Sequence, residues 1–160
     1  MKTIVVYYSM EGNTDFVAQS IAEATGADTL RIYPKKGYPT AGARKFIWGG
    51  ASAVMARTPA LEPYDFDATA YDRVIIGFPV WAGTFAPPIR TFIKENDVSG
   101  KQVAAFACQA GNGGEKALAK LKGLIGIDGL EAEMVLVDPK EKPTEENVKA
   151  IAQFCARLGE

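Results

Sequence analysis

Three short stretches of this chain contain residue types suited to hold a phosphorylated ligand that carries a flat ring. The first follows an apolar segment and consists of Ser9, Met10, Glu11, Gly12, Asn13 and Thr14. If these residues open a helix, its unpaired backbone N–H groups and its dipole both favour an anion. Gly12 allows the tight curvature that a phosphate requires. The stretch predicts a phosphate site, and a helix capped by Asn13 or Thr14 is the simpler alternative.

The same stretch argues against two kinds of nucleotide site. It contains no lysine and no G-x-x-x-x-G-K-[ST] pattern, which disfavours hydrolysis of a nucleoside triphosphate. It also has no G-x-G-x-x-G pattern, so a dinucleotide is not the expected occupant. A single terminal phosphate fits better. Asp15 is an awkward neighbour for a dianion, and we expect its carboxylate to point into solvent.

The second stretch, P-V-W-A-G-T-F-A-P-P, begins at the end of another apolar segment. Trp81 can stack on a flat aromatic ring, and the small residues beside it leave backbone amides open to a ligand. The alternative is that Trp81 only covers the edge of the core. The candidate binding residues in this stretch are Pro79, Val80, Trp81, Ala82, Gly83, Thr84 and Phe85.

The third stretch, C-Q-A-G-N-G-G-E, has three glycines in four positions, so backbone groups could reach a ligand. The alternative is a turn that caps a helix through Asn112. We expect the Cys108 thiol to serve packing more than chemistry, because it ends an apolar strand. The candidate residues here are Cys108, Gln109, Ala110, Gly111, Asn112 and Gly113.

Apolar runs alternate with helical patterns along the whole chain. The alternation predicts an α/β fold with a parallel sheet covered on both faces, and right-handed connections favour the strand order 2-1-3-4-5. In that order the three stretches meet at the carboxyl edge of the sheet, which together suggests a mononucleotide with a large ring. The five expected strands are Thr3 to Tyr8, Asp28 to Tyr33, Arg73 to Val80, Gln102 to Cys108 and Glu133 to Val137.

Helical spacing predicts which side chains face the sheet. In the first helix the expected buried stripe is Phe16, Val17, Ile21 and Ala24. In the last helix Thr144 is the expected N-cap, and the expected stripe is Val148, Ile151, Ala152, Cys155 and Leu158. Pro34 to Tyr64 is the least regular stretch, with a bent helix expected over Gly42 to Met55.

Composition narrows the chemistry further. The 160 residues suit one domain, and a net charge of -1 suggests neither nucleic acid nor a membrane as partner. The chain has no histidine, so Ser-His-Asp and Cys-His catalysis are excluded and a transition-metal site is not expected. Two distant cysteines favour reduced thiols and a cytoplasmic location. The first apolar run is too short for a signal peptide core.

The three motifs resemble those of the flavodoxin family, in V-V-Y-Y-S-M-E-G-N-T, I-I-G-F-P-V-W-A-G-T-F-A-P-P-I-R-T-F and A-C-Q-A-G-N-G-G-E. The resemblance covers almost the whole chain. It implies a short-chain, flavodoxin-like three-layer α/β/α sandwich over residues 1–160 that binds flavin mononucleotide (FMN) and carries electrons between redox partner proteins. It also implies that the first motif holds the phosphate and the other two hold the isoalloxazine ring. A peptide near Ala82 and Gly83 would turn its carbonyl toward the protonated ring.

Two features depart from the family's pattern. Well-studied flavodoxins are strongly acidic, whereas this chain is nearly neutral and has a basic cluster at Lys35, Lys36, Arg44, Lys45 and Arg57. The cluster is either a solvated face or a rim that attracts an acidic protein or a phosphorylated nicotinamide. Trp48 lies outside the usual flavin motifs. It is either a core residue or part of a lid or a self-association surface.

Two other functions stay open on the same scaffold. One is an NAD(P)H-dependent reductase of quinones or flavins, for which NAD(P)H would be a further partner. The other is an interaction module without redox chemistry. A receiver domain is disfavoured, because no acidic pair follows the first strand, which ends in Tyr-Tyr-Ser.

Overall fold

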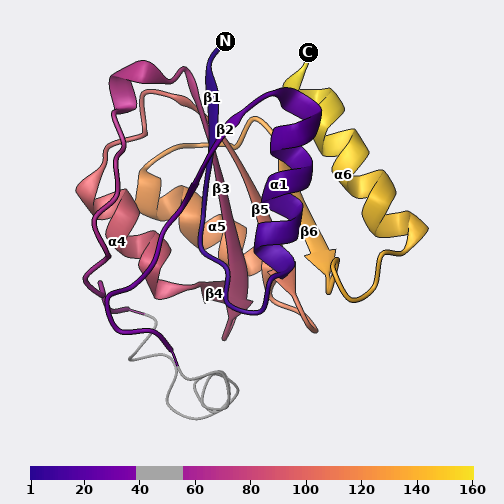
Figure 1. Ribbon diagram of the computed structural model, residues 1–160, viewed down its shortest axis with the longest axis horizontal. Helices are drawn as coiled ribbons and strands as arrows, with labels where there is room; N and C mark the ends of the chain where they lie inside the picture. The colour runs from indigo at the N-terminus through magenta and orange to yellow at the C-terminus, as the bar shows by residue number, and fades with distance from the viewer. Residues whose placement is uncertain (39–55) are drawn as a thin grey trace.

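The computed structural model describes residues 1–38 and 56–160, and these residues form a central sheet of five parallel strands (Figure 1). In spatial order the strands are β2 (Asp28–Arg31), β1 (Thr3–Tyr7), β3 (Arg73–Trp81), β5 (Gln102–Gln109) and β6 (Glu133–Val137). A short sixth strand, β4 (Thr84–Phe85), pairs antiparallel with the end of β3. The α/β class and the predicted order of the five parallel strands are confirmed.

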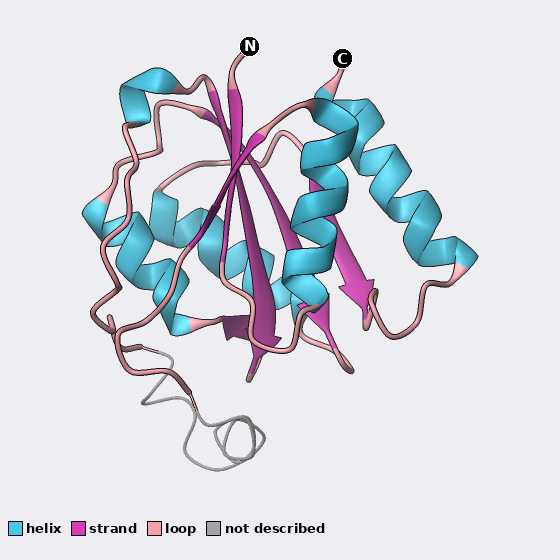
Figure 2. Cartoon of the chain, viewed as in Figure 1, coloured by secondary structure: helices cyan, strands magenta, loops and turns pink. Residues whose placement is uncertain are grey.

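Helices cover both faces of the sheet (Figure 2). The helices α1 (Asn13–Thr25) and α6 (Glu145–Leu158) cover one face, and α4 (Pro87–Glu95) and α5 (Gly114–Ile125) cover the other. A single 3-10 turn, η1 (Ala68–Ala70), precedes β3. None of the helices in the described ranges has the length and apolarity needed to cross a membrane.

Alternation along each strand supplies both layers of the core. On β1, Val5 and Tyr7 pack toward α1 and α6, whereas Ile4 and Val6 pack toward α4 and α5. All four are buried. A strand buried on both faces needs apolar side chains at every position, which explains why the first run has no polar alternation.

The predicted stripe of α1 is wrong at its two ends. Phe16 and Ala24 are exposed, and the buried face consists of Thr14, Val17, Ala18 and Ile21. The small residues Thr14 and Ala18 allow the helix to lie close to the sheet.

The predicted stripe of α6 is also wrong at two positions. Val148 and Ala152 are exposed, whereas Asn147 and Phe154 are buried. The Asn147 side-chain amide donates to the carbonyl oxygens of Val137 and Lys142, both at 2.9 Å, so these two hydrogen bonds compensate the burial of a polar side chain. The expected N-cap is confirmed, since Thr144 Oγ1 accepts from the Asn147 backbone N–H at 3.2 Å.

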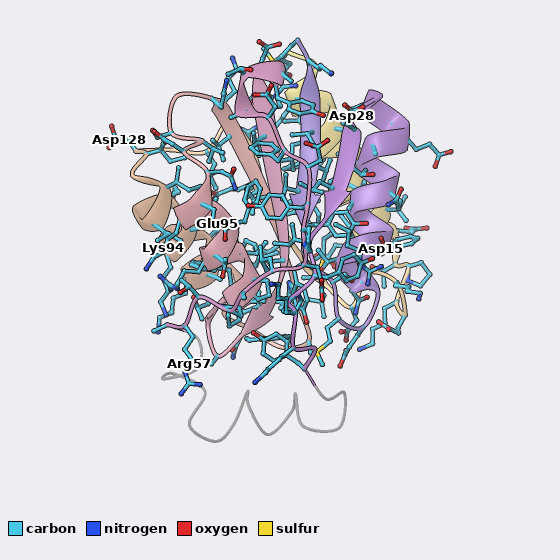
Figure 3. The ribbon with its side chains drawn as sticks, turned by 60° about the vertical axis from the view of Figure 1, so that its left-hand side comes forward. Asp15, Asp28, Arg57, Lys94, Glu95 and Asp128 are labelled. Carbon is cyan, nitrogen blue, oxygen red and sulfur yellow. The ribbon has the colours of Figure 1, made fainter. Side chains whose placement is uncertain are left out.

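The chain on the two sides of residues 39–55 is joined by backbone hydrogen bonds. Pro34 and Leu61 form an isolated antiparallel bridge, and the Glu62 N–H donates to the Tyr33 carbonyl at 2.7 Å. The predicted helix over Gly42 to Met55 lies outside the described residues. So do three residues of the basic and aromatic features noted above, Arg44, Lys45 and Trp48. Arg57 is exposed and projects outward from the chain (Figure 3).

Candidate functional site

A cavity of about 530 Å³ lies at the carboxyl ends of β1, β3 and β5. Its wall combines five residues from each of the three predicted stretches with one further residue, Asp138. The lining residues are Ser9, Met10, Glu11, Asn13, Thr14, Pro79, Val80, Trp81, Ala82, Gly83, Cys108, Gln109, Ala110, Gly111, Asn112 and Asp138. The fold therefore brings the three stretches together at the edge of the sheet where they were expected.

Four candidate residues do not line this cavity. Gly12 and Gly113 are the N-cap residues of α1 and α5, and both have a positive φ angle, of 98° and 97°. Thr84 and Phe85 are buried in β4.

The first wall is the start of α1. Because Gly12 is the N-cap, neither Asn13 nor Thr14 caps the helix through its side chain. Ser9 Oγ accepts from the Asp15 N–H at 3.1 Å. Among the residues that the structure describes, no side chain accepts from the Asn13 or Thr14 N–H. Both residues line the cavity, so the first two backbone amides of a helix are available there, which is the donor set that a phosphate needs.

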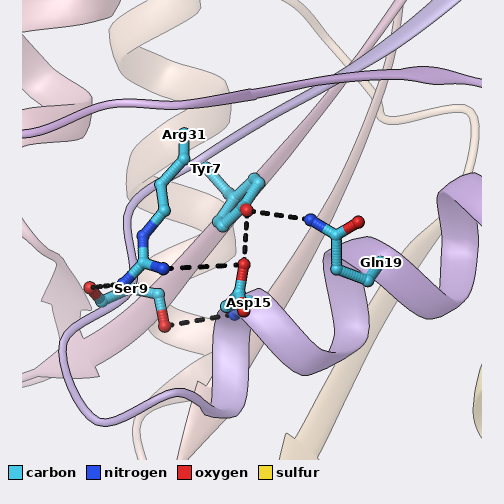
Figure 4. Close-up of polar contacts among 5 residues, drawn as sticks. All are labelled: Tyr7, Ser9, Asp15, Gln19 and Arg31. Atoms are coloured by element: carbon cyan, nitrogen blue, oxygen red, sulfur yellow. Dashed lines mark hydrogen bonds and ion pairs between the residues drawn. The ribbon is translucent and has the colours of Figure 1, made fainter.

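The expectation that Asp15 points into solvent is wrong (Figure 4). Its Oδ1 accepts from the Tyr7 hydroxyl at 2.5 Å and lies 3.7 Å from Arg31 Nη1. Arg31 Nη2 also donates to the Ser9 carbonyl at 3.2 Å, and Gln19 Nε2 donates to the Tyr7 hydroxyl at 3.2 Å. Burial, together with the hydrogen bond to Asp15, raises the pKa of Tyr7 to about 12. The network links the loop before α1 to β2 and places the Arg31 guanidinium beside the Asp15 carboxylate, which reduces its repulsion of an anion.

The second wall is a β-hairpin where a loop was expected. Val80 pairs with Phe85 and Trp81 with Thr84, which leaves Ala82 and Gly83 as a two-residue turn. Both turn residues have a positive φ, 50° for Ala82 and 72° for Gly83, as type I′ turns require. An alanine in this region carries a strain of about 1–2 kcal/mol, so the turn stores strain at the cavity wall.

Trp81 is part of the core and also borders the cavity. The residue lines the cavity, yet it is only 5% exposed. The rings of Tyr8 and Tyr38 meet it edge-on, with centroids 5.7 Å and 5.1 Å away. The indole is therefore held in one orientation by its neighbours, and its stacking on a bound ring stays a prediction.

The third wall is ordered by the side chain of Gln109. Its Oε1 accepts from the Gly114 N–H at 2.8 Å, and its Nε2 donates to the Gly111 carbonyl at 3.1 Å. A β-carbon at Gly113 would lie 3.0 Å from Gly83 Cα, so the second and third walls touch backbone to backbone. The proposed capping role of Asn112 is wrong, because Gly113 occupies the N-cap position.

Cys108 lies at the base of the cavity and is buried. Burial raises the pKa of its thiol to about 12, and a hydrogen bond with Thr14 opposes the shift only in part. A neutral thiol of this kind is a weak nucleophile. The packing role expected for Cys108 agrees with this environment.

The raised pKa makes stability depend on pH. The folded state keeps the Cys108 proton to a higher pH than the unfolded chain. The stability that the protonated thiol contributes is therefore present below about pH 9 and is lost between about pH 9 and 12. We expect the unfolding free energy of wild type to fall by up to about 1.4 kcal/mol per pH unit in this window, and less steeply in Cys108→Ala. Denaturant unfolding of both proteins at several pH values between about 8 and 10 would measure the difference in slope.

Cys155→Ala, at a half-buried site, is the matched control and should reduce the slope less. Equal slopes in wild type and Cys108→Ala would contradict the assignment.

Asp138 is the lining residue that the sequence analysis missed. It directly follows β6, and its φ of 42° is unusual for a residue other than glycine. Its N–H donates to the Gln109 carbonyl at 3.0 Å, and its carboxylate lies 3.5 Å from Lys142 Nζ. The signal was available, because the residue after each parallel strand lies at the same edge of the sheet.

The assembled cavity suits one mononucleotide. Its volume lies within the range of about 300–1,000 Å³ that small-molecule sites occupy. Backbone amides at a helix start form one end, and an aromatic hairpin and a glycine-rich loop form the other two walls. The donor set at the helix start fits a phosphate, and the two other walls fit a flat ring.

Known proteins that are similar to this chain include flavodoxins and flavoproteins, in agreement with a cavity that suits a mononucleotide. The family model Flavodoxin_4, described as flavodoxin, matches residues 2–150. A structure of a candidate flavoprotein from Bacteroides eggerthii DSM 20697 has 26% sequence identity and a TM-score of 0.78, over 99% of this chain and 98% of that chain. A flavoprotein from Lactobacillus acidophilus NCFM in complex with FMN has 26% identity and a TM-score of 0.69, over 88% and 95% of the two chains. Oxidised Flavodoxin 1 from Bacillus cereus shares the fold at 18% identity, with a TM-score of 0.63 over 99% and 97%.

Proposed function

The chain belongs to the flavodoxin family and binds FMN, and from this we propose that it carries electrons between redox partner proteins. Bound FMN supplies the redox chemistry, in steps of one or two electrons. The protein's own residues are left with binding, orientation and control of access, which is consistent with a chain that has no histidine.

The residues of the cavity divide these tasks among the three walls. The Asn13 and Thr14 amides and the Ser9 hydroxyl would hold the phosphate at the start of α1. The hairpin from Trp81 to Thr84 and the loop after Cys108 would hold the ring between them. Arg31 keeps the first wall in place through the Ser9 carbonyl.

The observation that carries the proposal is the make-up of the cavity rim. Ala82, Ala110 and Gly111 line the cavity and are exposed, and each has a small side chain or none. No bulky group at these positions separates the cavity from solvent. A partner protein could therefore approach the edge of the ring closely, as electron transfer between proteins requires.

The strained turn supports a second part of the proposal. Ala82 and Gly83 both have a positive φ. A peptide bond that is followed by glycine can reorient most easily, because glycine tolerates the change in backbone angles. We propose that the Ala82–Gly83 peptide reorients its carbonyl when the ring is reduced and protonated.

Stepwise anaerobic reduction tests the carrier function. We expect the absorbance spectra, recorded after each addition of reductant, to show a distinct species at one electron per flavin before full reduction. A direct two-electron change with no such species would contradict a one-electron carrier.

The same titration tests the reductase alternative. NADPH alone should reduce the flavin of a carrier slowly, because no partner protein is present. Rapid bleaching by NADPH would favour an NAD(P)H-dependent reductase of quinones or flavins. Lys35 and Lys36, which are exposed, would then be the first candidates for phosphate contacts.

Exposed charges and free cysteines support proposals about the redox partner and about the cellular compartment of the protein. The same two lysines and Arg57 are exposed cations, which supports an acidic redox partner. Cys108 and Cys155 are free thiols, which supports a reducing compartment such as the cytoplasm.

A further inference from the structure

A lysine from a distant part of the chain lies against the first wall. A β-carbon at Gly12 would lie 2.9 Å from Lys140 Nζ and 3.4 Å from its Cδ. The Lys140 backbone N–H also donates to Asn13 Oδ1 at 2.9 Å. A hydrogen bond thus links the loop between β6 and α6 to the first residue of α1. Glycine at position 12 leaves the space that the lysine side chain uses.

The charges around the cavity give this lysine a role. The lining residues that carry charge are Glu11 and Asp138, and the described wall contains no lysine or arginine. A dianion in this cavity would therefore have two acidic residues and no basic residue in the described wall. Lys142 pairs with Asp138 at 3.5 Å, whereas Lys140 forms no ion pair with any residue that the structure describes. Lys140 does not itself line the cavity, but its ammonium group lies next to Gly12, the N-cap of α1.

We propose that Lys140 is the cationic member of the phosphate site and makes the protein prefer FMN over riboflavin, which lacks the phosphate. The proposal rests on the FMN-binding function stated above. The first loop itself contains no lysine, so the positive charge is supplied by the fold and not by the motif. Lys140 is exposed, and its effect is therefore electrostatic and dependent on salt.

Titration of the apoprotein with each flavin, followed by flavin fluorescence, tests the proposal. We expect Lys140→Gln to bind FMN about five- to tenfold more weakly than wild type at low ionic strength, and to bind riboflavin equally well. At about 1 M salt, where the Debye length is about 3 Å, the difference for FMN should nearly disappear. Lys140→Arg keeps the charge and should retain most of the preference for FMN.

The control variant is Lys149→Gln, which removes the same charge from an exposed position on α6, outside the loop that contacts Gly12 and Asn13. It should leave both affinities unchanged. Unchanged FMN affinity in Lys140→Gln would overturn the assignment of Lys140 and leave the proposed function intact. Equal weakening for FMN and riboflavin would overturn it too, since it would indicate a structural role. If wild type bound neither flavin, the proposed function would fail and the assignment with it.

Discussion

Gly77→Ala should lower the unfolding free energy by about 3 kcal/mol, the largest stability effect that we expect from a single methyl group. Gly77 lies in the middle of β3, paired with Tyr7 on one side and Phe106 on the other. A β-carbon there would overlap the ring of Phe106. Phe106 is fully buried and packs edge-on against Phe154, with centroids 6.5 Å apart, so its ring cannot move aside at low cost.

Denaturant unfolding of the apoprotein measures this effect without the cofactor. Gly123→Ala is the control with the same added methyl, because Gly123 lies within α5 and has nothing within 4 Å of its β-carbon position. It should stabilise the protein by about 0.5–1 kcal/mol, since alanine is the better helix former. The double variant Gly77→Ala with Phe106→Leu should be more stable than the sum of the two single losses predicts. A loss below about 1 kcal/mol for Gly77→Ala would mean that the core relaxes around the methyl.

Gly113→Ala should weaken FMN binding about 10- to 100-fold. Gly113 has a φ of 97°, which an alanine adopts only with a strain of about 1–2 kcal/mol. The new methyl would also lie 3.0 Å from Gly83 Cα and 3.4 Å from Val80 Cγ1. It would push apart the two walls that hold the ring, and each wall depends on the other for its position.

Fluorescence titration of FMN into the apoprotein measures the loss of affinity. The control is Gly26→Ala, which introduces backbone strain at a positive φ without a new side-chain contact. Gly26 is the C-cap of α1, with a φ of 72° and nothing within 4 Å of its β-carbon position. Its alanine variant should lose about 1 kcal/mol of stability and keep its FMN affinity. If both variants bound FMN like wild type, the contact between the second and third walls would not matter for the cofactor.

Much of the fold and most of the cavity could be predicted from the sequence because the signals are local. A strand buried on both faces must be apolar throughout, as Thr3–Tyr7 is, and a parallel sheet collects the carboxyl ends of its strands at one edge. The three stretches were recognised as one site for this reason. The helix starts were placed in the right stretches, but their caps were not predicted: Gly12 and Gly113 occupy the N-cap positions at positive φ, where polar side chains were expected.

Helical faces were harder to predict because apolar spacing alone does not decide which side meets the sheet. On α6 the burial of Asn147 follows from two carbonyl acceptors, one of them in β6, which helical spacing cannot reveal. The turn at Ala82 and Gly83 was expected as a loop, since alanine gives no sign of the positive φ that the pairing of β3 with β4 imposes.

The sequence by itself determined the strand order, the three walls of the cavity and the kind of ligand that they suit, because hydrophobic period and turn chemistry act over a few residues. Only the tertiary structure decided which charges surround that ligand. Asp15 on α1 meets Arg31 on β2, and Lys140 reaches Gly12 from a distant part of the chain. Such pairs are separated by 16 to more than 100 residues, so packing of the sheet and its helices brings them together, and no local pattern records it.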